Sequence, residues 1–238
     1  MSEETGANNV SEYFRTPMYL EKLMQIFFFN NFQDMEKYRV ILNKLVNNLV
    51  ECVVKRPDIA KRFIRDCEEA YYLPTHSINT AVYAVSAIQT MDYEYSDLLE
   101  TGLGALFHDL GMIYVPKKVI TKSEMLTNEE VYMIQQHPKK GIELLGRENK
   151  IVQNIVLKHH EKFKGGGYPL GTSYRFSGDL LASVVGLADV FDAMTTFRIY
   201  KEKLTIPEAR KYIHNEGTEN WSKDVIAAFN KGLNRLGV

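Results

Sequence analysis

Apolar residues recur every three or four positions along most of the chain, which is the spacing of one face of an α-helix. We find no convincing run of alternating apolar and polar residues, the pattern that would indicate a β-strand, and no internal repeat. The chain is therefore predicted to be all-α. The predicted helices cover residues 19–32, 35–54, 57–70, 76–85, 95–110, 128–145, 149–160, 176–196, 207–214 and 221–236.

Capping and terminating residues mark several of these helix ends. Thr75 is placed to cap a helix whose first turn contains His76. Thr127 begins a capping-box sequence, and the helix that follows is expected to carry His137 near its middle. Gly111 is typical of a residue that terminates a helix. Histidines that could take part in chemistry are thus predicted near the start of one helix and near the middle of another.

The N-terminal part of the chain differs from the rest in its chemistry. Residues 1–16 are polar and weakly patterned, so we expect a loose arm that becomes helical near Pro17. The whole segment 1–66 lacks histidine and lacks carboxylates clustered at ligand spacing. We interpret it as a helical segment for packing, dimerisation or regulation, whose partner is a second copy or another protein. Residues 67–238 are predicted to form the functional domain.

Composition narrows the class of protein. The 29 Lys and Arg residues nearly balance the 30 Asp and Glu residues, so bulk charge does not favour a DNA or RNA polymer or an anionic membrane as partner. An anionic ligand must therefore be bound by groups within one site, since the net charge of the chain does not attract it. The two cysteines, Cys52 and Cys67, form no disulfide framework, and we find neither a membrane span nor a signal-peptide core. A cytoplasmic protein is expected.

The candidate chemistry lies in histidines and aspartates. Carboxylates inside the very apolar helix at residues 176–196 cost several kcal/mol unless they are paired or bind metal. Imidazole and carboxylate ligands without thiolates suit manganese, iron or catalytic zinc, and a bridging carboxylate can hold two ions about 3.5–4 Å apart. We expect Asp109 to be that bridge. The candidate ligands are His76, His108, Asp109, His137, His159, His160 and Asp189.

The order of these residues resembles the HD superfamily of metal-dependent phosphohydrolases. The segment His159-His160-Glu161 followed by Gly167-Tyr168-Pro169 resembles the HD-GYP group in particular, and the resemblance runs from about Cys67 to the C-terminus. It implies an HD-type helical bundle and hydrolysis of the 3′-5′ phosphodiester bond of cyclic di-GMP or a related cyclic dinucleotide. The implied products are linear pGpG, GMP or both, formed at two divalent ions, iron or manganese, with a bridging hydroxide.

The resemblance also implies a role for each matching residue. His76, His108, Asp109 and Asp189 would hold one ion, and Asp109, His137, His159 and His160 the second; His108 and Asp109 would be catalytic. Some relatives hold a third ion with a glutamate that is replaced here by Tyr72, so we expect a binuclear site. The implied ligand-binding residues are Gly166, Gly167, Tyr168, Pro169, Arg198 and Lys201.

One departure from the family pattern keeps a second function open. Where the family has a lysine that contacts phosphate, this chain has Met112, which supplies no charge. Lys117 and Lys164 replace acidic family positions and either return positive charge to the site or are solvated surface residues. The alternative to a phosphodiesterase is therefore a weakly active or inactive cyclic dinucleotide sensor or docking module. The Gly-Tyr-Pro segment argues against a phosphohydrolase for other nucleotides.

Overall fold

The computed structural model describes residues 3–29, 35–66, 72–146, 148–173, 179–196 and 202–238. These residues form helices and no strand, which confirms the all-α prediction. No helix among them is long and apolar enough to cross a membrane. The longer helices are α1 (Glu3–Phe29), α2 (Met35–Lys55), α4 (Tyr72–Ile88), α5 (Tyr95–Phe107), α7 (Asn128–Gln135), α8 (His137–Leu145), α9 (Lys150–Lys158), α10 (Leu180–Thr195), α11 (Ile206–Glu216) and α12 (Lys223–Leu236). Short helical elements are α3 (Pro57–Ala60), α6 (Lys117–Ile120) and the 3-10 helices η2 (Lys61–Phe63), η4 (Leu110–Tyr114) and η5 (Gly217–Glu219).

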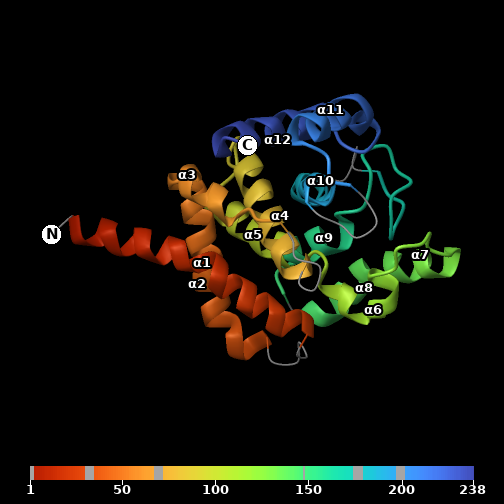
Figure 1. Cartoon of the computed structure of the whole chain (residues 1–238), viewed down its shortest axis with the longest axis horizontal. Helices are drawn as coiled ribbons and strands as arrows, with labels where there is room; N and C mark the ends of the chain where they lie inside the picture. The colour runs from red at the N-terminus through yellow and green to blue at the C-terminus, as the bar shows by residue number, and fades with distance from the viewer. Residues whose placement is uncertain (1–2, 30–34, 67–71, 147, 174–178, 197–201) are drawn as a thin grey trace.

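Helix α4 is the centre of the bundle (Figure 1). Every residue from Leu73 to Ile88 is buried, as expected for a helix that has neighbours on all sides. It packs against α5, α10 and α12, and also against α1 and α2. His76, the first candidate ligand in the sequence, lies near the start of this buried helix, so packing on all sides holds its position.

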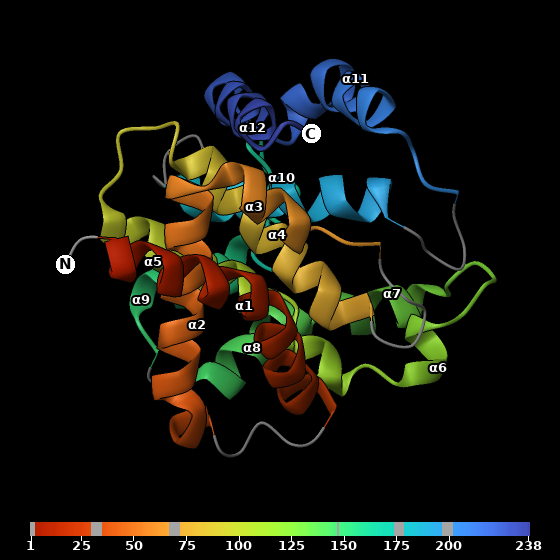
Figure 2. The ribbon, with the colours of Figure 1, turned by 60° about the vertical axis from the view of Figure 1, so that its left-hand side comes forward.

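The N-terminal helices pack directly onto the rest of the bundle (Figure 2). Helix α1 already begins at Glu3, so the prediction of a loose arm over residues 1–16 was wrong, and Pro17 lies inside the helix rather than in its first turn. The buried side chains of Tyr13 and Leu20 show the reason, because the apolar stripe of α1 continues upstream of the proline. Burial of this stripe outweighs the backbone hydrogen bond that Pro17 cannot make.

Several predicted helix bounds also need correction. The helix predicted over residues 128–145 is two helices, and His137 begins α8 instead of lying mid-helix. Pro138 explains the break, because it has no backbone N–H to donate to the carbonyl four residues earlier and its ring crowds that carbonyl. Helix α4 begins at Tyr72, so Thr75 is within its first turns and is not its cap. The helix predicted over residues 57–70 ends in η2 and does not continue through residues 64–66, while residues 67–70 lie outside the described chain.

Candidate metal centre

The structure brings all seven candidate ligands together from five parts of the bundle. His76 comes from α4, while His108 and Asp109 occupy the turn between α5 and η4. The remaining ligands come from the start of α8, the end of α9 and the middle of α10, and these are His137, His159, His160 and Asp189. Three overlapping groups of these side chains have ligand atoms within 4.8 Å of one another. We call the seven residues the histidine-aspartate cluster.

Two glycines allow the backbones that carry the cluster to approach closely. A Cβ atom at Gly111 would lie 1.9 Å from the carbonyl oxygen of His137, and one at Gly186 would lie 1.9 Å from that of His159. No other residue fits at either position without moving a helix. Gly111 therefore lies within η4 as a packing residue, and it does not terminate α5 as the sequence suggested.

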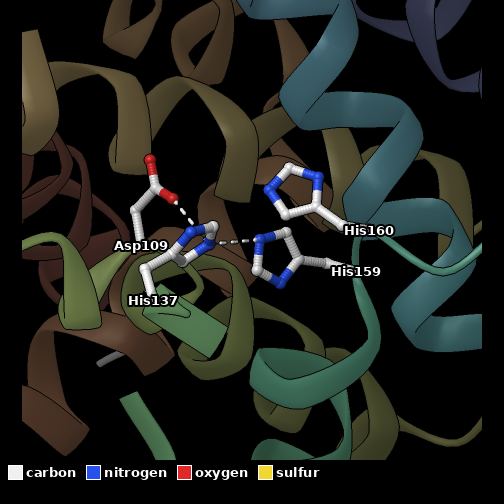
Figure 3. Close-up of side chains that lie close together, drawn as sticks. All are labelled: Asp109, His137, His159 and His160. Atoms are coloured by element: carbon white, nitrogen blue, oxygen red, sulfur yellow. Dashed lines mark hydrogen bonds and ion pairs between the residues drawn. The ribbon is translucent and has the colours of Figure 1, made fainter. Parts of the chain in front are cut away.

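One half of the cluster contains Asp109, His137, His159 and His160 (Figure 3). His137 lies between two partners: its Nε2 atom is 3.3 Å from Oδ1 of Asp109 and 3.2 Å from Nε2 of His159. His137 and His159 are both 2 % exposed. Three atoms that can accept hydrogen bonds or bind a cation thus converge in a space nearly closed to water.

The protons of these imidazoles are directed away from the centre. Nδ1 of His137 donates to the carbonyl of Ile134 at 2.8 Å, and Nδ1 of His159 donates to the carbonyl of Val156 at 3.0 Å. A carbonyl oxygen can only accept, so a neutral imidazole in this position has a lone pair on Nε2. The two facing Nε2 atoms therefore have no proton between them, and a cation placed there would satisfy both.

His108 follows the same rule. Its Nδ1 atom donates to the carbonyl of Ala105 at 2.7 Å, which directs the Nε2 lone pair inward. That Nε2 atom is buried and has no hydrogen-bond partner among the described residues. Buried polar atoms are nearly always satisfied in proteins, so this orphan acceptor fits a metal ligand. The residues present therefore suit divalent cations held by nitrogen and oxygen.

The other half of the cluster is organised around His76. Its Nδ1 atom is 2.6 Å from Oδ2 of Asp192, and its Nε2 atom is 3.0 Å from Oδ1 of Asp189. With the proton on Nδ1, the Nε2 lone pair faces inward. Asp109 links the halves, because its Oδ2 lies 3.6 Å from Nε2 of His108 while its Oδ1 faces His137. This is the placement that a bridging carboxylate requires.

Burial sets the protonation of the cluster. It lowers the pKa of His159 well below the usual histidine value, and the neighbouring imidazoles of His160 and His108 lower it further. Burial also lowers the pKa of His137, and it lowers the pKa of His160 to about 4. Burial alone would raise the pKa of Asp109, but the adjacent imidazoles hold it below its usual value. Near pH 7 these groups therefore present imidazole lone pairs and a carboxylate anion.

Asp192 is a functional residue that the sequence did not assign. It is fully buried, orients His76, and also accepts a hydrogen bond from the Asn79 amide at 2.8 Å. The sequence could have indicated this residue, because it lies one helical turn after Asp189 in an otherwise apolar helix. Carboxylates that hold the second nitrogen of a metal-binding histidine fix its tautomer and its direction.

Removing this carboxylate should weaken metal binding without deleting a ligand. We expect Asp192→Ala to lower metal affinity about 10–100-fold, because the His76 ring loses the partner that orients it. Competition with a chelator of known affinity measures the change. Asp58→Ala, which removes an exposed carboxylate, is the control. Equal affinities of the two variants would show that His76 does not depend on Asp192.

A cleft of about 490 Å³ opens onto the cluster. Tyr168 forms part of its wall, with its ring stacked on His160 at 4.4 Å between centroids and 27° between planes. Met112, at the position where the family has lysine, also lines the cleft and is 7 % exposed. Tyr72 lies at the same cleft and offers no carboxylate. The described wall is mostly apolar, and its polar side chains are those of the cluster and of three tyrosines, Tyr72, Tyr168 and Tyr212.

The candidate ligand-binding residues are placed unevenly. Of Gly166, Gly167, Tyr168 and Pro169, it is Tyr168 that lines the cleft. Gly166 has a positive φ of 78°, and a Cβ atom at Gly167 would lie 2.4 Å from the carbonyl oxygen of His160, so both positions need glycine. We call residues 162–171 the Gly-Tyr-Pro loop.

The predicted cationic contacts receive less support from the geometry. Lys117 is exposed at the start of α6 and lines an adjoining apolar groove, not the cleft. Lys164 is exposed and forms an ion pair with Glu219, so it does not reach the cleft either. Arg198 and Lys201 lie outside the described residues.

These features define a candidate metal centre, and comparison with known proteins identifies the family. The sequence profile of the HD domain family matches residues 44–222, which is most of the chain, so the protein belongs to that family. The match begins within α2, inside the segment predicted to be separate from the functional domain. The proposed boundary at residue 66 stays a prediction.

Several curated relatives are phosphodiesterases. A cyclic di-GMP phosphodiesterase of Pseudomonas aeruginosa is 28% identical over 192 residues, covering 79% of this chain and 46% of the relative. The cyclic di-GMP phosphodiesterase of Thermotoga maritima is 36% identical, covering 56% and 37%. A 3′3′-cGAMP-specific phosphodiesterase of Vibrio cholerae is 32% identical, covering 44% and 20%. The chain spans less than half the length of each of these three.

A solved structure supports the same fold. An HDG"Y"P protein from Bdellovibrio bacteriovorus superposes with a TM-score of 0.69 over 90% of this chain and 70% of that chain. The two sequences are 19% identical. The two proteins therefore share this helical arrangement.

Proposed function

We propose that this chain is a metal-dependent phosphodiesterase that hydrolyses a 3′-5′ phosphodiester bond of cyclic di-GMP or a related cyclic dinucleotide. Linear pGpG, GMP or both would be released. The observation that carries the proposal is the convergence of Asp109, His137 and His159, whose facing acceptor atoms have no proton between them. The activities of these relatives supply the substrate class.

Two groups of residues would hold a binuclear centre. His76, His108, Asp109 and Asp189 would bind one ion, and Asp109, His137, His159 and His160 the other. Divalent ions, for which iron and manganese suit this donor set, would lower the pKa of water and neutralise charge on phosphoryl oxygens.

The chain itself contributes orientation and exclusion of water. Backbone carbonyls hold the rings of His108, His137 and His159, so their Nε2 atoms need no reorganisation before binding. The apolar cleft wall limits water around the phosphate and so strengthens electrostatic contacts within the site. The Tyr168 ring, stacked on His160, would confine the nucleotide beside the cluster.

A second candidate function is a cyclic dinucleotide sensor that binds the ligand without efficient turnover. Met112 favours it, because a neutral thioether at the cleft wall replaces the cationic phosphate contact of the family. Lys117 and Lys164 do not line the cleft and so do not replace that charge. Loss of one such contact costs about 10²–10³-fold in rate.

A product assay separates the two functions. We expect protein purified without oxygen and loaded with iron or manganese to convert cyclic di-GMP to a linear product, which chromatography detects. Met112→Lys should raise turnover about tenfold or more, because it returns a cation to the cleft. If the wild type and the variant both bind cyclic di-GMP tightly but form no product with either metal, the phosphodiesterase is rejected in favour of the sensor.

A further inference from the structure

Glu161 is a buried carboxylate that the metal centre does not use. It directly follows the ligand pair His159 and His160 and is 3% exposed. One of its oxygens, Oε2, has no hydrogen-bond partner among the described residues. Burying a carboxylate is costly, so its remaining contacts should show what it is for.

The side chain of Glu161 makes its hydrogen bonds with the far end of the Gly-Tyr-Pro loop. Oε1 of Glu161 accepts a hydrogen bond from the backbone N–H of Leu170 at 2.5 Å and another from Gly171 at 3.1 Å. Both amides thus find their acceptor in a single side-chain oxygen. The loop therefore leaves the chain at Glu161 and is tied back to the same residue nine and ten positions later.

The tie places the loop against the metal ligands. The backbone N–H of Tyr168 donates to the carbonyl of His160 at 3.2 Å, and the Tyr168 ring stacks on the His160 imidazole. Gly167 packs so closely on the backbone of His160 and Glu161 that a Cβ atom would not fit. The position of Tyr168 at the cleft wall thus depends on a loop closed by Glu161.

We propose that Glu161 is a positioning residue that couples the part of the histidine-aspartate cluster at His159 and His160 to the wall of the cleft. By closing the Gly-Tyr-Pro loop, it keeps Tyr168 stacked on His160 and holds the cleft in a shape that receives the nucleotide. The part of the proposal that concerns nucleotide binding rests on the proposed function. The part that concerns the loop does not, because it follows from the hydrogen bonds of Leu170 and Gly171 alone.

Hydrogen exchange of the full chain without nucleotide tests the loop. The amides of Leu170 and Gly171 should be protected in the wild type. In Glu161→Ala they should exchange at least about tenfold faster, because the variant removes the oxygen that accepts from both amides. Glu161→Gln should stay within about threefold of the wild type, since the Gln side-chain oxygen can accept from both amides.

Kinetics then test the coupling to the site. Glu161→Ala should retain its metal and raise KM for cyclic di-GMP about tenfold, with a smaller change in kcat, and Glu161→Gln should restore KM. Ser86→Ala is the control for lost stability, because it removes a buried hydrogen bond to Gly232 far along the chain from the loop. It should lower the thermal midpoint and leave KM unchanged.

Three results would overturn the proposal. Rapid exchange of the Leu170 and Gly171 amides in the wild type would overturn it. This result needs no variant, so it decides the question even if Glu161→Ala fails to fold. Equal disturbance of the loop by Glu161→Gln and Glu161→Ala would show that the oxygen acceptor is not what matters. A normal KM in a Glu161→Ala protein with a loosened loop would separate the loop from the site. If the wild type hydrolyses no cyclic di-GMP, the proposed function fails while the exchange result still decides the role of Glu161.

Discussion

Asp109→Asn is expected to lower turnover of cyclic di-GMP by at least about 10²–10³-fold and to remove at least one of two bound ions. Asp109 is the carboxylate whose two oxygens face different halves of the histidine-aspartate cluster. An amide keeps the shape of the side chain but offers one weak oxygen ligand and no charge. Elemental analysis and the product assay on the same sample measure both effects.

The matched control is Asp224→Asn, which neutralises an exposed aspartate of α12. It should leave metal content and rate unchanged. If Asp109→Asn retained two ions with full occupancy, Asp109 would not bridge the two halves, and the binuclear assignment would be wrong.

Gly186→Ala is expected to lower the free energy of unfolding by about 3 kcal/mol, the upper end for overpacking a tight interface. The added methyl group would lie 1.9 Å from the carbonyl oxygen of His159, which is backbone and cannot turn aside. Helices α9 and α10 would have to separate, and with them His159 and Asp189. Urea denaturation followed by circular dichroism measures the loss.

Gly102→Ala is the matched control, since Gly102 is also a buried glycine within a helix. Its added methyl would meet a side-chain atom, Cγ2 of Val50, at 3.3 Å, and alanine favours helix by up to about 1 kcal/mol. We expect it to be nearly neutral. Similar stabilities of the two variants would show that α9 and α10 can move apart freely, so that Gly186 does not set the spacing of the cluster.

The sequence predicted the helical fold and the membership of the cluster for a physical reason. Helical periodicity is a local property, and the histidines and aspartates lie at helix ends or within apolar helices where such residues need partners. The resemblance to the HD superfamily then implied which residues meet. Asp192 could have been added on the same grounds, because it lies one turn from Asp189.

Other features depend on tertiary contacts that no local pattern contains. The stability of α1 upstream of Pro17 comes from burial against α2 and α4, which periodicity in a polar segment did not reveal. Lys164 could equally have faced the cleft or the solvent, and its partner Glu219 is distant in the sequence. The role of Glu161 could not be predicted either, because its contacts are with backbone amides, which have no side-chain signature.

The direction of the imidazole protons has a consequence for the abundance of the folded protein. His108, His137 and His159 give their protons to carbonyls three residues earlier, so folding itself forces lone pairs and a carboxylate toward one another. A cation that binds these groups stabilises the folded chain, because the unfolded chain does not hold them together. By mass action, an ion present at a hundred times its Kd adds about 2.7 kcal/mol to the stability of the folded chain. Divalent metal supply would then govern how much folded protein persists, whether or not any nucleotide is present.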